Sequence, residues 1–145
     1  MANAPKLDWR GDFLQNWSAP IALAGRLGLA YIFLVDGAGA ISHAADVAAY
    51  MAANGVNGGL LPLVIVTEIG GGLMVLAGFL TRWAAIALAG FCILTAALFH
   101  TGSDDIGEAI HFQKDLAIAG GLLVLAAFGP GAWSLDAWRG RPGER

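Results

Sequence analysis

The stretch from Leu60 to Arg82, LLPLVIVTEIGGGLMVLAGFLTR, decides the fold of this chain. It holds about 20 apolar or small residues in succession, enough for a helix that crosses roughly 30 Å of hydrocarbon. One carboxylate, Glu68, lies inside it, and because a charge in lipid costs about 3 kcal/mol or more, we expect it to face protein and to have a partner. Gly71, Gly72 and Gly78 follow near the same helical face, so a second helix can pack closely beside Glu68.

The composition of the whole chain agrees with a membrane location. The 145 residues are 57% hydrophobic and 13% charged, about half the charge of an average globular protein. A soluble helical protein would need a polar stripe on each helix, and these segments lack one. The net charge of −3 and the absence of a basic run argue against nucleic acid as a partner. The single cysteine, Cys92, excludes a Cys-x-x-Cys relay within this chain.

Four apolar segments alternate with polar connections, which predicts an all-α integral membrane four-helix bundle. The predicted spans are Ile21 to about Ile41, the stretch quoted above, Trp83 to about Phe99, and about Asp115 to Phe128, the last extending through Trp133. Pro20 suits the start of the first helix. Thr81 and Arg82 are expected to form a tight turn, and a short surface helix is expected from Asp46 to Asn54, ending at Gly55.

The two ends of the chain are polar. Leu7, Phe13, Leu14 and Trp17 fall on one helical face, which suggests a short helix lying in the membrane interface. The alternative is a disordered tail. We therefore divide the chain into an N-terminal arm (1–19), a four-span domain (20–136) and a basic C-terminal tail (137–145).

Basic and aromatic residues predict the orientation. With four spans, the basic residues that fall on one side are Lys6, Arg10, Arg82, Arg139, Arg141 and Arg145. Only Lys114 falls on the other side, and Arg26 lies within a span. The five tryptophans also lie on the basic side, as an interfacial belt would. Both signals place the two termini in the cytoplasm.

Several ionisable residues fall within or at the ends of the spans. At about 1.5 Å of rise per residue, the backbones of Arg26 and Glu68 differ in height by under about 10 Å, which suggests an ion pair. The alternative is that Arg26 extends to the cytoplasmic headgroups. Asp36 and His100 lie near the outer boundary, as do Lys114, Asp115 and His111.

We expect the spans to converge on an outer pocket formed by Asp36, His100, Lys114 and Asp115, with Glu68 as its floor. Ionisable groups inside a membrane are candidates for function. For Lys114, Asp115 and His111, solvated or helix-capping roles remain open.

The chemistry that best suits these groups is proton-coupled quinone binding. The histidine spacing is poor for a metal, and no haem-attachment motif, flavin site or nucleotide loop is evident. His100 and Lys114 can donate hydrogen bonds to the carbonyl oxygens of a quinone, while Glu68 and Asp36 can exchange protons. The apolar spans would hold an isoprenoid tail.

The chain resembles the DoxX family of small four-span membrane proteins. The residues that carry the resemblance are Arg26-Leu27, Phe33-x-x-x-Gly37, Tyr50 to Gly55, Glu68-Ile-Gly-Gly-Gly, Gly78-x-x-Thr81-Arg82-x-x-Ala85, His100, Lys114 to Leu116, Gly120-Gly121-Leu122-Leu123 and Gly129-x-Gly131-x-x-Ser134-Leu135-Asp136. Together they cover about Pro20 to Asp136. The resemblance implies a four-helix membrane bundle, and some family members are linked to thiosulfate:quinone oxidoreductase and other membrane redox complexes. The chain departs from the family at Asp36 and Ala40-Ile41, where a small residue and a nearby lysine are more usual, which puts the outer-pocket chemistry in question.

We therefore expect a protein of the bacterial inner membrane that acts as a quinone-linked subunit or accessory of a membrane oxidoreductase. The expected catalytic residues are Glu68, Asp36 and His100, and the expected cofactor-binding residues are Arg26, Glu68, His100, Lys114 and Asp115, with no metal. Expected partners are membrane lipids, another redox protein and a second copy of the chain. Two alternatives stay open: a non-enzymatic membrane scaffold or assembly factor, and a pathway for small solutes or protons.

Overall fold

The computed structural model describes residues 9–101 and 106–140, with side chains from Trp17 onward, and all regular structure in these residues is helical. The elements are α1 (Trp9–Ser42), α2 (Ala44–Ala53), η1 (Gly58–Leu60), α3 (Leu61–Ile65), η2 (Val66–Gly70), α4 (Gly71–Ala77), α5 (Thr81–Phe99), α6 (Ile106–Phe128) and α7 (Leu135–Arg139). Four segments are long and apolar enough to span a membrane: Trp17–Ser42, Gly58–Ala77, Thr81–Phe99 and Ile106–Phe128. Their outward faces carry large apolar side chains such as Phe128 and Trp83, which are 84% and 72% exposed. Such surfaces belong in lipid, and the predicted four-helix membrane bundle is confirmed.

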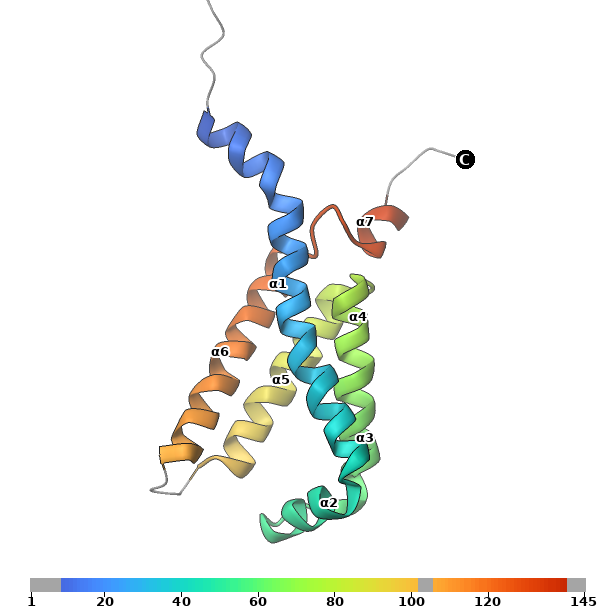
Figure 1. Ribbon diagram of the computed structural model, residues 1–145, viewed down its shortest axis with the longest axis vertical. Helices are drawn as coiled ribbons and strands as arrows, with labels where there is room; N and C mark the ends of the chain where they lie inside the picture. Colours follow the sequence, from blue (N-terminus) through green and yellow to red (C-terminus); the bar gives the residue numbers. More distant parts are fainter. Residues whose placement is uncertain (1–8, 102–105, 141–145) are drawn as a thin grey trace, which may run out of the picture.

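The four spans pack as two close pairs (Figure 1). Helix α1 lies along α4 and η2, α5 lies along α6, and α4 joins the pairs by packing on α5. Helices α1 and α6 make few contacts. Both ends of the described chain, the start of α1 and α7, lie at one end of the bundle, which we call the terminal end. Helix α2 lies at the opposite end, the α2 end.

Small residues let the spans approach closely, as the glycines of the second span predicted. A Cβ on Gly72 would lie 3.2 Å from the side chain of Leu34 on α1, and one on Gly71 would lie 2.8 Å from Leu88 on α5. Gly78 has a different role from the one expected. Its φ of 68° ends α4 with a left-handed residue instead of extending the packing face.

The structure corrects several predicted boundaries. Helix α1 runs through Pro20 without a break, so the predicted arm is continuous with the first span from Trp9 onward; Leu7 lies outside the described residues. Thr81 and Arg82 open α5, and the tight turn precedes them at Gly78 to Leu80, where Leu80 also has a positive φ of 45°. Helix α6 begins at Ile106 and ends at Phe128, short of Trp133. The surface helix is confirmed as α2, with Gly55 in a left-handed conformation just after it.

The second span is not one regular helix. Its central turn, η2, is a π-helix that contains Glu68. A π turn holds one residue more than an α turn, and such turns are rare and often lie at functional sites. The Thr67 hydroxyl, in this turn, donates to the carbonyl oxygen of Leu63 in α3 at 2.8 Å. A side chain thus bonds to a backbone carbonyl just before the irregular turn.

The segment from Gly129 to Arg139, which we call the C-terminal clasp, covers the terminal end. The Asp136 carboxylate accepts hydrogen bonds from the amides of Leu80 and Thr81, both at 2.9 Å, and from the Thr81 hydroxyl at 2.7 Å. The Asp136 amide donates to the carbonyl oxygen of Gly78. The clasp therefore satisfies backbone groups left free at the α4–α5 turn.

The electrostatics of Asp136 follow from these contacts. Partial burial acts to raise the pKa of Asp136, but the hydrogen bonds from Thr81 and Leu80 and the charge of Arg139 outweigh it, so the pKa falls below its usual value. The carboxylate is thus held in its ionised form. At the same end, the Arg82 guanidinium donates to the carbonyl oxygens of Ala126 and Ala127, both at 2.9 Å, and caps the end of α6.

Candidate functional site: a polar and an apolar cavity at the α2 end

A cavity of about 300 Å³, which we call the polar cavity, opens between α1 and the α5–α6 pair toward the α2 end. It is lined by Ile32, Phe33, Asp36, Tyr50, Glu68, Phe91, Cys92, Thr95, Phe99, His100, His111, Lys114, Asp115 and Ile118. Five of these, Asp36, Glu68, His100, Lys114 and Asp115, are the residues that the sequence analysis expected to converge. The structure brings them together, and it adds His111 to them.

The two carboxylates of the first and second spans meet because of helix packing at Gly37. A Cβ on Gly37 would lie 2.8 Å from the Ile69 side chain and 3.2 Å from Glu68 Cβ. Glycine at this position lets η2 lie directly against α1. Glu68 is therefore level with Gly37 and its neighbour Asp36, and the π turn that carries Glu68 forms one wall of the cavity.

On the opposite wall, His100 is held between two carboxylates. Its Nδ1 lies 2.6 Å from Glu108 Oε2, and its Nε2 lies 3.9 Å from Asp115 Oδ2. The side chains of His100, Glu108 and Asp115 are 18%, 30% and 21% exposed. Thr95 donates to Asp115 at 3.3 Å, which also fixes that carboxylate.

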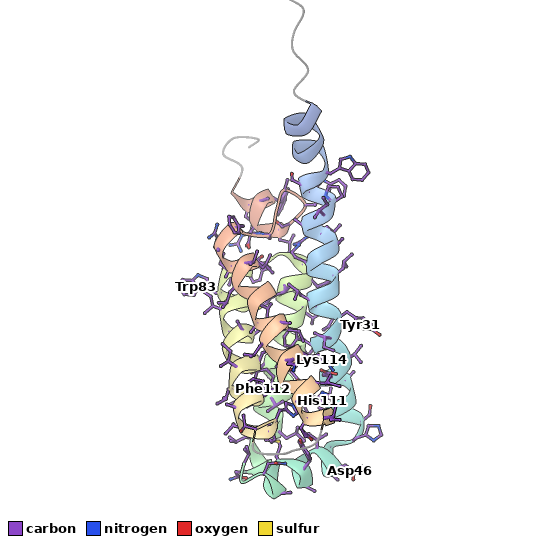
Figure 2. The ribbon with its side chains drawn as sticks, turned by 90° about the vertical axis from the view of Figure 1, so that its left-hand side faces the viewer. Tyr31, Asp46, Trp83, His111, Phe112 and Lys114 are labelled. Carbon is purple, nitrogen blue, oxygen red and sulfur yellow. The ribbon has the colours of Figure 1, made fainter. Side chains whose placement is uncertain are left out.

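A second imidazole lies against the first. The rings of His111 and His100 stack with their centres 5.2 Å apart and an angle of 23° between them. Lys114 Nζ lies 3.5 Å from His111 Nδ1. Figure 2 shows His111 and Lys114 close together on α6, in the half nearest α2. The cavity thus contains acidic groups from three spans and basic groups from two.

The predicted ion pair between Arg26 and Glu68 is wrong. Arg26 is 1% exposed and donates from Nη2 to the carbonyl oxygen of Trp133 in the clasp. Its Nε and Nη1 are buried and have no hydrogen-bond partner among the residues that the structure describes. Arg26 contacts Gly78, ten residues beyond Glu68 and so about 15 Å further along the second span. The guanidinium therefore belongs to the terminal end and not to the polar cavity.

A second cavity, which we call the apolar cavity, adjoins the first and measures about 320 Å³. It lies between α2, α3 and α5. Its lining is Val47, Tyr50, Met51, Val56, Leu60, Leu63, Val64, Thr67, Glu68, Phe91, Leu94, Thr95, Leu98 and Phe99. Five residues line both cavities: Tyr50, Glu68, Phe91, Thr95 and Phe99. A polar space and an apolar space therefore meet at one set of side chains.

The sequence analysis missed Tyr50, Thr95 and Glu108 as members of this region. The Tyr50 and Phe99 rings stack at 5.5 Å, which fixes α2 over the cavity mouth. Burial, and after it the charge of Glu108, raises the pKa of Tyr50 above its usual value. Thr95 lies three residues after Cys92 on α5, and both line the polar cavity. Glu108 gave no signal in the sequence, because it lies in the polar connection between the third and fourth predicted spans.

Among residues 9–101 and 106–140, no group of three or more His, Cys, Asp or Glu side chains is arranged to hold a metal ion. The groups of the polar cavity instead form hydrogen bonds and ion pairs with one another. Their arrangement suits a ligand that accepts and donates hydrogen bonds and exchanges protons.

The fold and the two cavities define a four-span integral membrane protein with an internal polar site. A comparison with family models matches residues 21–101 to DoxX. The chain belongs to the DoxX family, as the resemblance in its sequence predicted.

Two relatives come from Escherichia coli K12. The chain is 47% identical over 114 residues to the inner membrane protein YqjF, an alignment that covers 79% of this chain and 88% of the relative. It is 32% identical over 123 residues to the inner membrane protein YphA, covering 80% and 88%. No solved structure matches the chain. The protein is a multi-pass inner-membrane protein.

Proposed function

We propose that this protein binds a quinone, or a similar redox molecule with an apolar tail, as a subunit or accessory of a membrane oxidoreductase. The observation that carries the proposal is that the polar and apolar cavities adjoin and share five lining residues. A quinone has the same two parts: a headgroup with carbonyl oxygens and an apolar tail. Each cavity, at about 300 Å³, is of the size of a small-molecule site.

The polar cavity contains the groups that quinone chemistry needs. Reduction of a quinone to a quinol takes up two electrons and two protons. Lys114, and His100 once it is protonated to the imidazolium, would donate hydrogen bonds to the carbonyl oxygens. Glu68, Asp36 and Asp115 would exchange protons with the ring oxygens. Phe91 and Phe99, which line both cavities, offer aromatic faces to the ring.

The electrons require a partner. The single cysteine of the chain, Cys92, is buried, so the side chains supply no dithiol couple. We therefore propose a second redox protein as electron donor or acceptor. We further propose that the terminal end faces the cytoplasm, since the basic residues and tryptophans of the sequence favour that orientation.

Mass spectrometry of an organic extract from the purified protein tests the proposal. Wild type should contain quinone at near-stoichiometric amount. Glu68→Gln and His100→Ala should lose most of it, because each removes a group from the polar cavity. Asp46→Asn is the matched control, since Asp46 is an exposed carboxylate on α2 that lines neither cavity.

Bulk phospholipid alone in all four extracts would refute quinone binding. It would favour the scaffold alternative, in which the cavity charges serve only to fix the packing of the helices. Loss of quinone from Asp46→Asn as well would indicate a general effect of charge removal and would also count against the proposed site.

A further inference from the structure

We propose that Glu108, His100 and Asp115 form a proton-exchange triad in which Glu108 is a positioning residue that orients His100 toward the polar cavity. The inference rests on the proposed function for its ligand but not for its geometry. It adds Glu108, which lines neither cavity, and it assigns separate roles to the two nitrogens of the imidazole.

The geometry at His100 defines which nitrogen carries the proton. Nδ1 lies 2.6 Å from Glu108 Oε2, a hydrogen-bond distance, whereas Nε2 lies 3.9 Å from Asp115 Oδ2. Where Glu108 is ionised, its carboxylate can only accept, and we therefore assign the Nδ1 proton to the hydrogen bond with Glu108. In the neutral ring Nε2 is then left without a proton and faces Asp115. A carboxylate behind a histidine fixes the tautomer and the ring orientation in this way in many sites.

The proton-exchange step is simple. When a reduced ligand, or a protonated Asp115 acting through one water across the 3.9 Å gap, gives up a proton, Nε2 accepts it. The ring becomes an imidazolium, whose charge the Glu108 carboxylate stabilises through Nδ1. The reverse step returns the proton from Nε2 to the cavity and restores the neutral ring. No electron moves and no covalent bond to carbon changes.

The surroundings of His100 support an exchange role over a purely structural pair. The titratable groups that face this cavity from the other elements are Asp36 on α1, Tyr50 on α2, Glu68 on η2 and Cys92 on α5, with His111 and Lys114 beside Asp115 on α6. A surface pair that only fixed the α5–α6 connection would not need its second nitrogen turned toward this cluster. The Glu108 side chain is 30% exposed, so the triad is accessible from outside the bundle.

Nitrogen NMR of the full chain in lipid bilayers tests this assignment directly. The sequence contains three histidines, His43, His100 and His111, so a sample labelled with ¹⁵N-histidine gives few signals, and His100→Gln identifies those of His100. At a pH where the ring is neutral, wild type should show a protonated Nδ1 and an unprotonated Nε2. Glu108→Gln should lose this preference, because its amide can donate to Nδ1 and so favours the other tautomer. Glu108→Asp should restore the wild-type pattern at least in part.

The outcomes separate this inference from the proposed function. A wild-type His100 that carries its proton on Nε2, or a tautomer unchanged in Glu108→Gln, would overturn the triad, whether or not quinone is bound. Absence of quinone from wild-type extracts would overturn the proposed function and leave the NMR result intact. Where both hold, the control Asp46→Asn should keep both the quinone and the His100 tautomer of wild type, since Asp46 lines neither cavity.

Discussion

Gly78 offers the sharpest test of how the terminal end is closed. Its φ of 68° lies in the left-handed region, where a residue with a Cβ costs about 1–2 kcal/mol. An added Cβ would also overlap Arg26 Nη1 and Ser134 Cβ and lie 3.0 Å from Ser134 Cα. Arg26 is 1% exposed and bonded to the clasp, so it has little room to move. Overpacking of this kind costs about 1–3 kcal/mol. We therefore expect Gly78→Ala to lower the free energy of unfolding by about 2–5 kcal/mol.

Two other glycines separate the cost of backbone strain from the cost of overpacking. Gly55 has a φ of 77° but no atom within 4 Å of an added Cβ, so Gly55→Ala should show only the backbone strain, about 1–2 kcal/mol. Gly90 lies inside α5 with open space around it. Gly90→Ala should be neutral or stabilising by up to about 1 kcal/mol, because alanine is the better helix former.

Unfolding of the detergent-solubilised protein by added sodium dodecyl sulfate, followed by circular dichroism, gives the three free energies. The reasoning requires the order Gly78→Ala, Gly55→Ala, Gly90→Ala from most to least destabilised. If Gly78→Ala cost no more than Gly55→Ala, the buried contact of Arg26 and Ser134 with the α4–α5 turn would be refuted, and with it the account of Arg26 given above.

Two further predictions concern the clasp and the apolar cavity. Because the folded pKa of Asp136 is depressed, its stabilising contribution should be complete above pH 3.8, the usual value, and disappear as the pH falls through the lower folded value. Asp136→Asn should lower the free energy of unfolding by about 1–2 kcal/mol at neutral pH. It should also reduce the fall of the melting temperature as the pH is lowered into the acid range, and an unchanged fall would contradict this. Val64→Trp should fill part of the apolar cavity and reduce the quinone recovered in extracts several-fold, whereas Leu73→Trp, on an exposed position that lines neither cavity, should not. Equal recovery from both variants would remove the apolar cavity from the proposed site.

The sequence predicted the spans and the polar cavity because both follow from distances along the chain. Apolar runs of membrane length define the helices. Residues at equal distances from the span ends, such as Asp36 and His100, must then lie at similar depths. The convergence of Lys114 and Asp115 on the same level follows from the same arithmetic, and it is independent of the detailed packing.

What the sequence did not predict depends on contacts with no local pattern. The π turn at Glu68 lies inside a continuous apolar run. All faces of the helix carry similar apolar residues there, so no change of periodicity marks the extra residue of the turn. The hydrogen-bond partner of Arg26 is a backbone carbonyl 107 residues away, and no pairing of charges could point to it. The Arg26–Glu68 pair predicted from depths along the spans was wrong because the clasp lies over the terminal end and gives the buried guanidinium a partner there.

The two ends of the bundle use their charges differently, and this difference favours a ligand site at the α2 end. At the terminal end, Arg26, Arg82 and Asp136 all bond to backbone groups that helix ends and turns leave free. These three charged side chains therefore stabilise the fold at the terminal end. At the α2 end, the ionisable side chains face a cavity and one another. Since burying such groups is costly, their retention is best explained by a ligand that bonds to them. Protons would then reach that ligand from the α2 end, where Glu108, the neighbour of His100, is 30% exposed.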